Sequence, residues 1–127
     1  MMDQSSLRGQ VEVAYAAWNA AFNEGDAKAL AALYASDATF LPATHEVIQG
    51  PALIERFFAG LFANGLTAHT LDLIALHGDS STIVAAAKWT VQGAAPDGSA
   101  ATFDGVATHL FERQPGGGLR LKLHTFN

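Results

Sequence analysis

Apolar side chains recur every three or four residues in the first half of the chain, a spacing typical of amphipathic helices. The three stripes consist of Val11, Ala14, Tyr15, Trp18 and Phe22, of Leu30, Leu33 and Tyr34, and of Ile54, Phe57, Phe58 and Leu61. The first and third stripes each cover one face of a helix, and the second predicts a short helix. The pattern therefore predicts three helices before residue 65.

Residues suited to helix ends separate these stripes. Ser5 or Ser6 is expected to cap the first helix, and Gly25 is suited to end it in a left-handed conformation. Asp26 is expected to cap the second helix, and Pro51 to occupy the first position of the third. The Gly-Asp pair thus predicts a hinge that folds the second helix back on the first.

The second half of the chain changes to the two-residue alternation of β-strands. Strands are expected at 66–76, 81–93, 101–113 and 119–127, after a short strand at 38–41 that Pro42 ends. This order predicts an α+β fold in one domain, 1–127, with three helices and a meander of long antiparallel strands. A long twisted sheet that curls around helices forms a cone, whose open end is a pocket.

Composition and net charge exclude some classes of binding partner. The net charge is −5, and the few basic residues are scattered, which argues against binding to nucleic acid or to an anionic membrane. There is no cysteine, no signal peptide pattern and no apolar run of membrane-spanning length, so a cytoplasmic location is expected. Only 15% of residues are charged and the strand at 81–93 is apolar on both faces, which predicts a homodimer through the sheet.

The stretch WNAAFNEGDAKALAALYASDATF, residues 18–40, resembles the nuclear transport factor 2-like superfamily, and most closely its snoaL-like and ketosteroid isomerase-like members. Gly50 with Ile54, and the closing strand LRLKLHTFN, extend the likeness over nearly the whole chain. The resemblance implies a cystatin-like α+β barrel, in which three helices pack in a strongly curved mixed sheet around one pocket. It does not specify a function, because this fold hosts isomerases, cyclases, hydrolases and binding modules.

The steroid isomerases of that family use a carboxylate base and an oxyanion hole made of a Tyr and a protonated Asp. The resemblance places Trp18 at the Tyr position, Leu41 at the base and Ala107 at the protonated Asp. None of these three can perform the family's proton chemistry. Tyr15, one helical turn from Trp18, could substitute in part. The resemblance therefore does not imply steroid isomerisation by the family's usual residues.

The candidates for proton chemistry are His109 and Tyr15. His109 shares strand parity with Ala107 and Phe111, the face that the family points inward, where a neutral imidazole could act as a general base or donate to a ligand. The alternative is a core or interface histidine whose hydrogen bonds are made with backbone groups. Acid–base catalysis usually needs two groups with separated pKa values, and the sequence offers one His and one Tyr.

The other four histidines are weaker candidates for a functional role. His69 is expected on the strand surface, His77 in a turn, and His45 in a loop over the pocket mouth. His124 is out of phase with Leu119, Leu121, Leu123, Thr125 and Asn127, which alternation places on one face. No metal-binding motif is present, so neither a metal nor a cofactor is expected.

The expected ligand is a small apolar molecule that bears a ring. The residues expected to contact it are Tyr15, Trp18, Phe40, His45, Phe57, Leu61, Trp89, Ala107, His109, Thr125 and Asn127. Two functions remain open. The first is a small-molecule-binding protein that could also act on its ligand as an isomerase or cyclase does, and the second is a non-enzymatic ligand-binding or dimeric interaction module.

Overall fold

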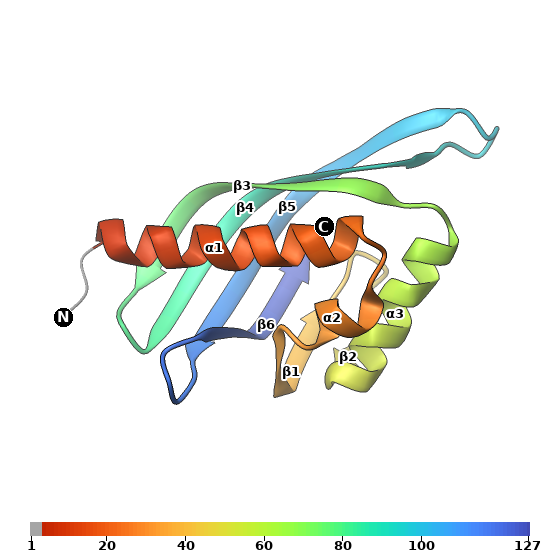
Figure 1. Ribbon diagram of the computed structural model, residues 1–127. Coiled ribbons are helices and arrows are strands. Elements are labelled where there is room, and N and C mark those ends of the chain that lie inside the picture. Colours follow the sequence, from red (N-terminus) through yellow and green to blue (C-terminus); the bar gives the residue numbers. More distant parts are fainter. Residues whose placement is uncertain (1–3) are drawn as a thin grey trace.

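The computed structural model describes residues 4–127, which form three helices and six strands (Figure 1). The helices are α1 (Gln4–Asn23), α2 (Ala27–Ala31) and α3 (Pro51–Ala63). The strands are β1 (Tyr34–Leu41), β2 (Ile48–Gln49), β3 (Thr67–Gly78), β4 (Thr82–Ala94), β5 (Ala100–Arg113) and β6 (Leu119–Phe126). The predicted α+β order of helices first and long strands last is confirmed.

All strands belong to one sheet in the order β2-β1-β6-β5-β4-β3. β1 pairs with β6 in parallel, and the other neighbours pair antiparallel, so the sheet is mixed. The sheet stays open, with β2 and β3 at its edges, and α1 runs across it in Figure 1. The expected barrel is thus a curved open sheet with its helices on one side.

The predicted hinge between α1 and α2 is present. Gly25 has a φ of 69°, the left-handed conformation that glycine adopts without steric cost. The Asp26 side chain accepts a hydrogen bond from the backbone N–H of Ala29 at 3.0 Å, as an N-cap residue does. Two boundaries were wrong. α1 already includes Ser5 and Ser6, so neither caps it.

The second wrong boundary is the start of β1. Tyr34 was assigned to the second helical stripe, and the strand was expected at Ala38. The structure ends α2 at Ala31 and begins β1 at Tyr34, which pairs with Leu121 of β6. The backbone N–H of Leu121 also bonds to the carbonyl of Leu33 at 3.0 Å. Pairing with β6 therefore overrides the helical spacing of this segment.

A β-bulge in β6 changes which of its residues face the helices. Leu121 lies opposite Phe111, whereas Leu123 lies opposite Leu110, so Lys122 is the extra residue. Alternation restarts after Lys122, and His124 joins Leu121 on the buried side. The prediction that all odd positions from 119 to 127 share one face was wrong for this reason.

The core lies between the helices and the inner face of the sheet. Its largest fully buried side chains include Tyr34, Phe40, Leu7, Leu30 and Ile54. Burying each large apolar side chain contributes about 1.5–3 kcal/mol. On β4 and β5, Lys88 and Asp104 are exposed, as their strand parity predicted. None of the helices in residues 4–127 is long and apolar enough to span a membrane.

Candidate ligand-binding site

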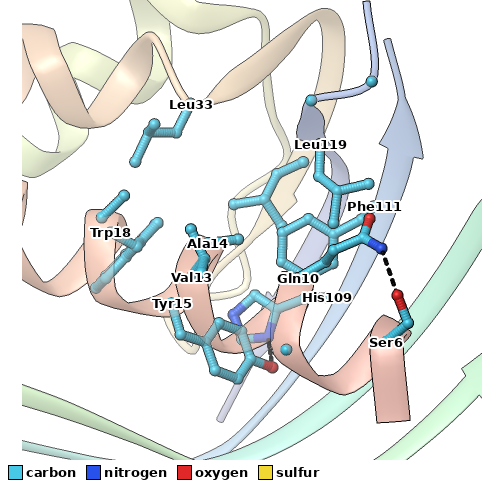
Figure 2. A pocket seen from close by; sticks show the side chains of 15 residues that line it. Ser6, Gln10, Val13, Ala14, Tyr15, Trp18, Leu33, His109, Phe111 and Leu119 are labelled. Atoms are coloured by element: carbon cyan, nitrogen blue, oxygen red, sulfur yellow. Dashed lines mark hydrogen bonds between the residues drawn. The ribbon is translucent and has the colours of Figure 1, made fainter. Parts of the chain in front are cut away.

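Two cavities flank α1, where the sequence predicted one pocket. The inner cavity, of about 420 Å³, lies between the C-terminal half of α1, α3 and the sheet. Its wall includes Trp18, Phe22, Phe57, Phe58, Leu61, His69, Leu71, Trp89, Val91, Ala107, His109, His124 and Phe126. The side cavity, of about 670 Å³, is lined by the N-terminal half of α1, Leu33 and the β5–β6 hairpin (Figure 2). Trp18 and His109 line both.

Most of the residues expected to contact a ligand lie on these walls. Trp18, Phe57, Leu61, Trp89, Ala107 and His109 line the inner cavity, and Tyr15 lines the side cavity. Their part in ligand binding stays a prediction.

Four of the expected residues are not among those that line either cavity. Phe40 is fully buried in the core, stacked on Phe58 and Phe126. His45 is exposed in the loop after β1, where its neighbour Thr44 reaches the inner cavity instead.

Thr125 and Asn127 are the other two. The bulge at Lys122 turns Thr125 to the outer face, and Asn127 is exposed at the chain end. The Asn127 backbone N–H and side chain bond instead to Val106 of β5. An expectation built on unbroken alternation could not place these residues correctly.

A buried hydrogen-bond chain runs from α1 to β6. The Trp18 Nε1–H donates to the Tyr34 hydroxyl at 3.1 Å, and that hydroxyl lies 2.8 Å from His124 Nδ1. Tyr34 is 1% exposed and His124 is 4% exposed. The chain fixes the orientation of both aromatic rings and of the imidazole. The sequence placed neither Tyr34 nor His124 in the site, since the first was assigned to a helix and the second to the outer face.

A second buried pair joins α1 to β5. The Tyr15 hydroxyl lies 2.9 Å from His109 Nδ1, and Figure 2 shows the phenol directed at the imidazole. The predicted inward position of His109 is confirmed, since the residue is 1% exposed. The rings of His109 and His124 lie side by side, with centroids 4.4 Å apart. Two imidazoles from adjacent strands thus meet at the inner cavity.

His69 is the third histidine of the inner cavity, and its expected surface position was wrong. Its Nδ1 lies 2.8 Å from Asn19 Oδ1. Asn23 bonds to the His69 backbone N–H at 2.6 Å and to its carbonyl at 3.1 Å. Asn19 and Asn23 are one helical turn apart on α1, and two polar residues at that spacing beside the apolar stripe were the signal for this contact.

Trp89 of β4 is held in place on several sides. It lies opposite Gly105 of β5, where an added Cβ would come within 2.8 Å of the indole. Its ring stacks on His69 and meets the edge of Phe126, with centroids 6.2 and 5.5 Å away. Trp89 Nε1 is the one buried side-chain nitrogen or oxygen in the described chain that has no hydrogen-bond partner. Such an unpaired donor costs about 1–3 kcal/mol.

Burial keeps the titratable groups of the site uncharged at neutral pH. Desolvation lowers the pKa of His69 to about 4. Desolvation, followed by the charge of His69, lowers the pKa of His109 to about 3. The pKa of His124 lies well below its usual value because of desolvation, followed by the charges of His109 and His69. Burial also raises the pKa of Tyr15 and of Tyr34.

The cavity walls carry no counter-charge. Among the described residues, no Asp, Glu, Lys or Arg lines either cavity. Nor do His, Asp or Glu side chains form a group that could hold a metal ion in the part of the chain that the structure describes. The site can therefore surround a ligand with apolar surface and offer it hydrogen bonds from neutral rings.

Comparison with known proteins identifies the family. The model of the SnoaL-like domain matches residues 15–117, so this chain belongs to the SnoaL-like family. The comparison with curated proteins found no match.

Solved structures share the fold over almost the whole chain. Aln2 from a Streptomyces species is 22% identical with a TM-score of 0.83, covering 100% of this chain and 94% of its own. A ketosteroid isomerase-like protein from Erwinia carotovora atroseptica is 13% identical with a TM-score of 0.80, covering 93% and 92%. An NTF2-like protein with a cystatin-like fold from Novosphingobium aromaticivorans is 21% identical with a TM-score of 0.78, covering 99% and 90%. The predicted resemblance to SnoaL-like proteins is confirmed, and the chain shares the fold of structures described as NTF2-like and ketosteroid isomerase-like.

Proposed function

We propose that this protein binds a small, largely apolar molecule that bears a ring, and that the inner cavity is its binding site. The observation that carries the proposal is the wall of that cavity, where aromatic side chains from α1, α3, β4 and β6 surround three neutral imidazoles. Its volume of about 420 Å³ falls within the range of small-molecule sites. Flat apolar ligands match such a wall because aromatic rings stack on them.

The same wall disfavours acid–base catalysis of the steroid isomerase kind. That chemistry needs a carboxylate base, and the positions implied by the family resemblance hold Trp18, Leu41 and Ala107. His109 is the remaining candidate base, but its lowered pKa makes it a weak proton acceptor at neutral pH. We therefore place ligand binding ahead of isomerase or cyclase activity.

The second candidate function is a dimeric interaction module, with the outer face of the sheet as the contact. Val106 of β5 is 44% exposed on that face, and Ile74 of β3 is 52% exposed. The half-buried Val84, Ala86, Leu110 and Leu123 extend this apolar surface over three strands. A second copy of the chain would cover it by the twofold pairing that is commonest in oligomers.

Native mass spectrometry of gently purified protein tests both ideas together. The expected spectrum is a dimer that carries a small apolar molecule. A monomer at micromolar concentration would overturn the dimer.

Titration with fluorene, a flat apolar probe, then tests the cavity alone. Both tryptophans of the protein line the inner cavity, so their fluorescence reports its occupation. Leu61→Trp should fill the cavity and abolish fluorene binding. Leu53→Trp, on the same helix but 46% exposed, is the matched control and should bind as the wild type does. Equal binding by both variants would contradict the assigned site.

A further inference from the structure

We propose that His124 and His109 form a pair of N–H donors that holds one carbonyl oxygen of an uncharged ligand in the inner cavity. This inference rests on the proposed function, because it needs a small molecule in that cavity. Tyr34 and Tyr15 are positioning residues, since each bonds to an imidazole and neither donates to the ligand.

The tautomer of His124 follows from the hydrogen bonds of the Tyr34 hydroxyl, which has a single hydrogen to donate. The Tyr34 oxygen already accepts the Trp18 Nε1–H. The single hydroxyl hydrogen of Tyr34 is then left for His124 Nδ1, 2.8 Å away. A neutral imidazole that accepts at Nδ1 carries its proton on Nε2. We assign that tautomer to His124 from these contacts, and its Nε2–H remains for a ligand.

For His109 the direction of the hydrogen bond is part of the inference. The Tyr15 hydroxyl lies 2.9 Å from His109 Nδ1, its one hydrogen-bond partner among residues 4–127, and we assign the hydroxyl as the donor. Donation by Tyr15 puts the proton of His109 on Nε2, as in His124. Both imidazoles line the inner cavity and lie 4.4 Å apart between centroids. Two N–H groups from neighbouring rings can converge on one oxygen, because a carbonyl oxygen accepts two hydrogen bonds.

The charge of the site selects the class of ligand. Among the described residues, the cavity offers no cation for a carboxylate or phosphate and no anion for an amine. Burying an unpaired ionic group there would be strongly unfavourable. An uncharged aromatic ketone satisfies both requirements, since its rings meet the aromatic wall and its oxygen meets the two donors.

Two matched probes separate this inference from the proposed function. Fluorene and 9-fluorenone share a flat tricyclic frame and differ in the carbonyl. Equilibrium dialysis should show that both bind, with 9-fluorenone tighter on the order of tenfold, the gain from two hydrogen bonds. The infrared C=O stretch of bound 9-fluorenone should lie at a lower frequency than in cyclohexane. Fluorene-9-carboxylate should not bind.

Two tyrosine variants test the donors themselves. Tyr15→Phe and Tyr34→Phe each keep the ring and remove the hydroxyl that orients one imidazole. Each should reduce the ratio of 9-fluorenone affinity to fluorene affinity. Phe57→Leu, in the same wall but outside the hydrogen-bond chain, should weaken both probes alike. The 15N shifts of the imidazoles of His109 and His124 should show protonated Nε2 in the wild type.

The outcomes are distinct. Binding of neither probe would overturn the proposed function and this inference with it. Equal binding of both, with an unshifted C=O stretch, would leave the cavity as an apolar binding site and overturn the donor pair. Wild-type histidines protonated at Nδ1 would also overturn it, whatever the affinities. The inference is supported when the carbonyl preference, the infrared shift and the Nε2 tautomers occur together.

Discussion

Removing the hydroxyl of Tyr34 is the sharpest test of the buried hydrogen-bond chain, independent of any ligand. Tyr34→Phe keeps the ring in its packed position, where it is 1% exposed. It leaves the Trp18 Nε1–H and His124 Nδ1 without their partner. Each buried polar group left unpaired costs about 1–3 kcal/mol, so the loss of both partners should lower the free energy of unfolding by about 2–6 kcal/mol.

Tyr15→Phe is the matched comparison. This substitution removes one hydrogen bond, the one to His109. Tyr15 lines the side cavity, so water can take the place of its hydroxyl. The expected loss is about 1 kcal/mol. Tyr34 has no such access, since its hydroxyl lies in the core between α1 and β6.

Urea denaturation of both variants and the wild type measures the difference. The midpoint should fall further for Tyr34→Phe than for Tyr15→Phe, with the dependence on urea unchanged. Losses of equal size, or a larger loss for Tyr15→Phe, would refute the reasoning that two buried groups depend on the Tyr34 hydroxyl. A changed dependence on urea would show that the variants alter more than one hydrogen bond.

Three further predictions concern stability. Gly105→Ala should destabilise the fold by more than about 2 kcal/mol, because its Cβ would lie 1.7 Å from the Asn127 carbonyl oxygen; Gly118→Ala, with open space, is the urea-denaturation control. Asn23→Ala should cost about 1–3 kcal/mol in the same assay by freeing the His69 backbone, and an unchanged midpoint would contradict it. The inner-cavity histidines have pKa values below 6.5 in the folded state, so their stabilisation is complete above pH 6.5 and is lost as pH falls towards 4. Each contributes up to about 1.4 kcal/mol per pH unit, and urea midpoints that stay flat from pH 6.5 to 4.5 would contradict neutral histidines.

The fold could be predicted because its signals are local. The stripes of α1 and α3, the Gly25-Asp26 hinge and the proline at position 51 depend on residues close together in the chain, and the structure keeps them. The start of β1 could not be predicted in the same way. Tyr34 has helical spacing from Leu30, and only its pairing with Leu121, far along the chain, makes it a strand residue.

The site was harder to predict than the fold for one physical reason. Strand parity propagates along a whole strand, so one extra residue reverses every assignment beyond it. In β6 the bulge at Lys122 has this effect: His124 lies on the inner side, where unbroken alternation would place Thr125. No bulge intervenes in β5 between Ala107 and His109, and there the predicted inward face was right.

The bulge also explains why the cavity contains neighbouring imidazoles. Unbroken alternation would place His124 on the outer face, opposite the face of His109. Because of Lys122, His124 instead lies directly beside His109, and Tyr34 reaches its Nδ1 from β1. The partly exposed Lys122 side chain also forms ion pairs with Asp37 of β1 and Glu112 of β5. The β-bulge at Lys122, which the sequence pattern did not predict, therefore places His124 beside His109 in the polar part of the site.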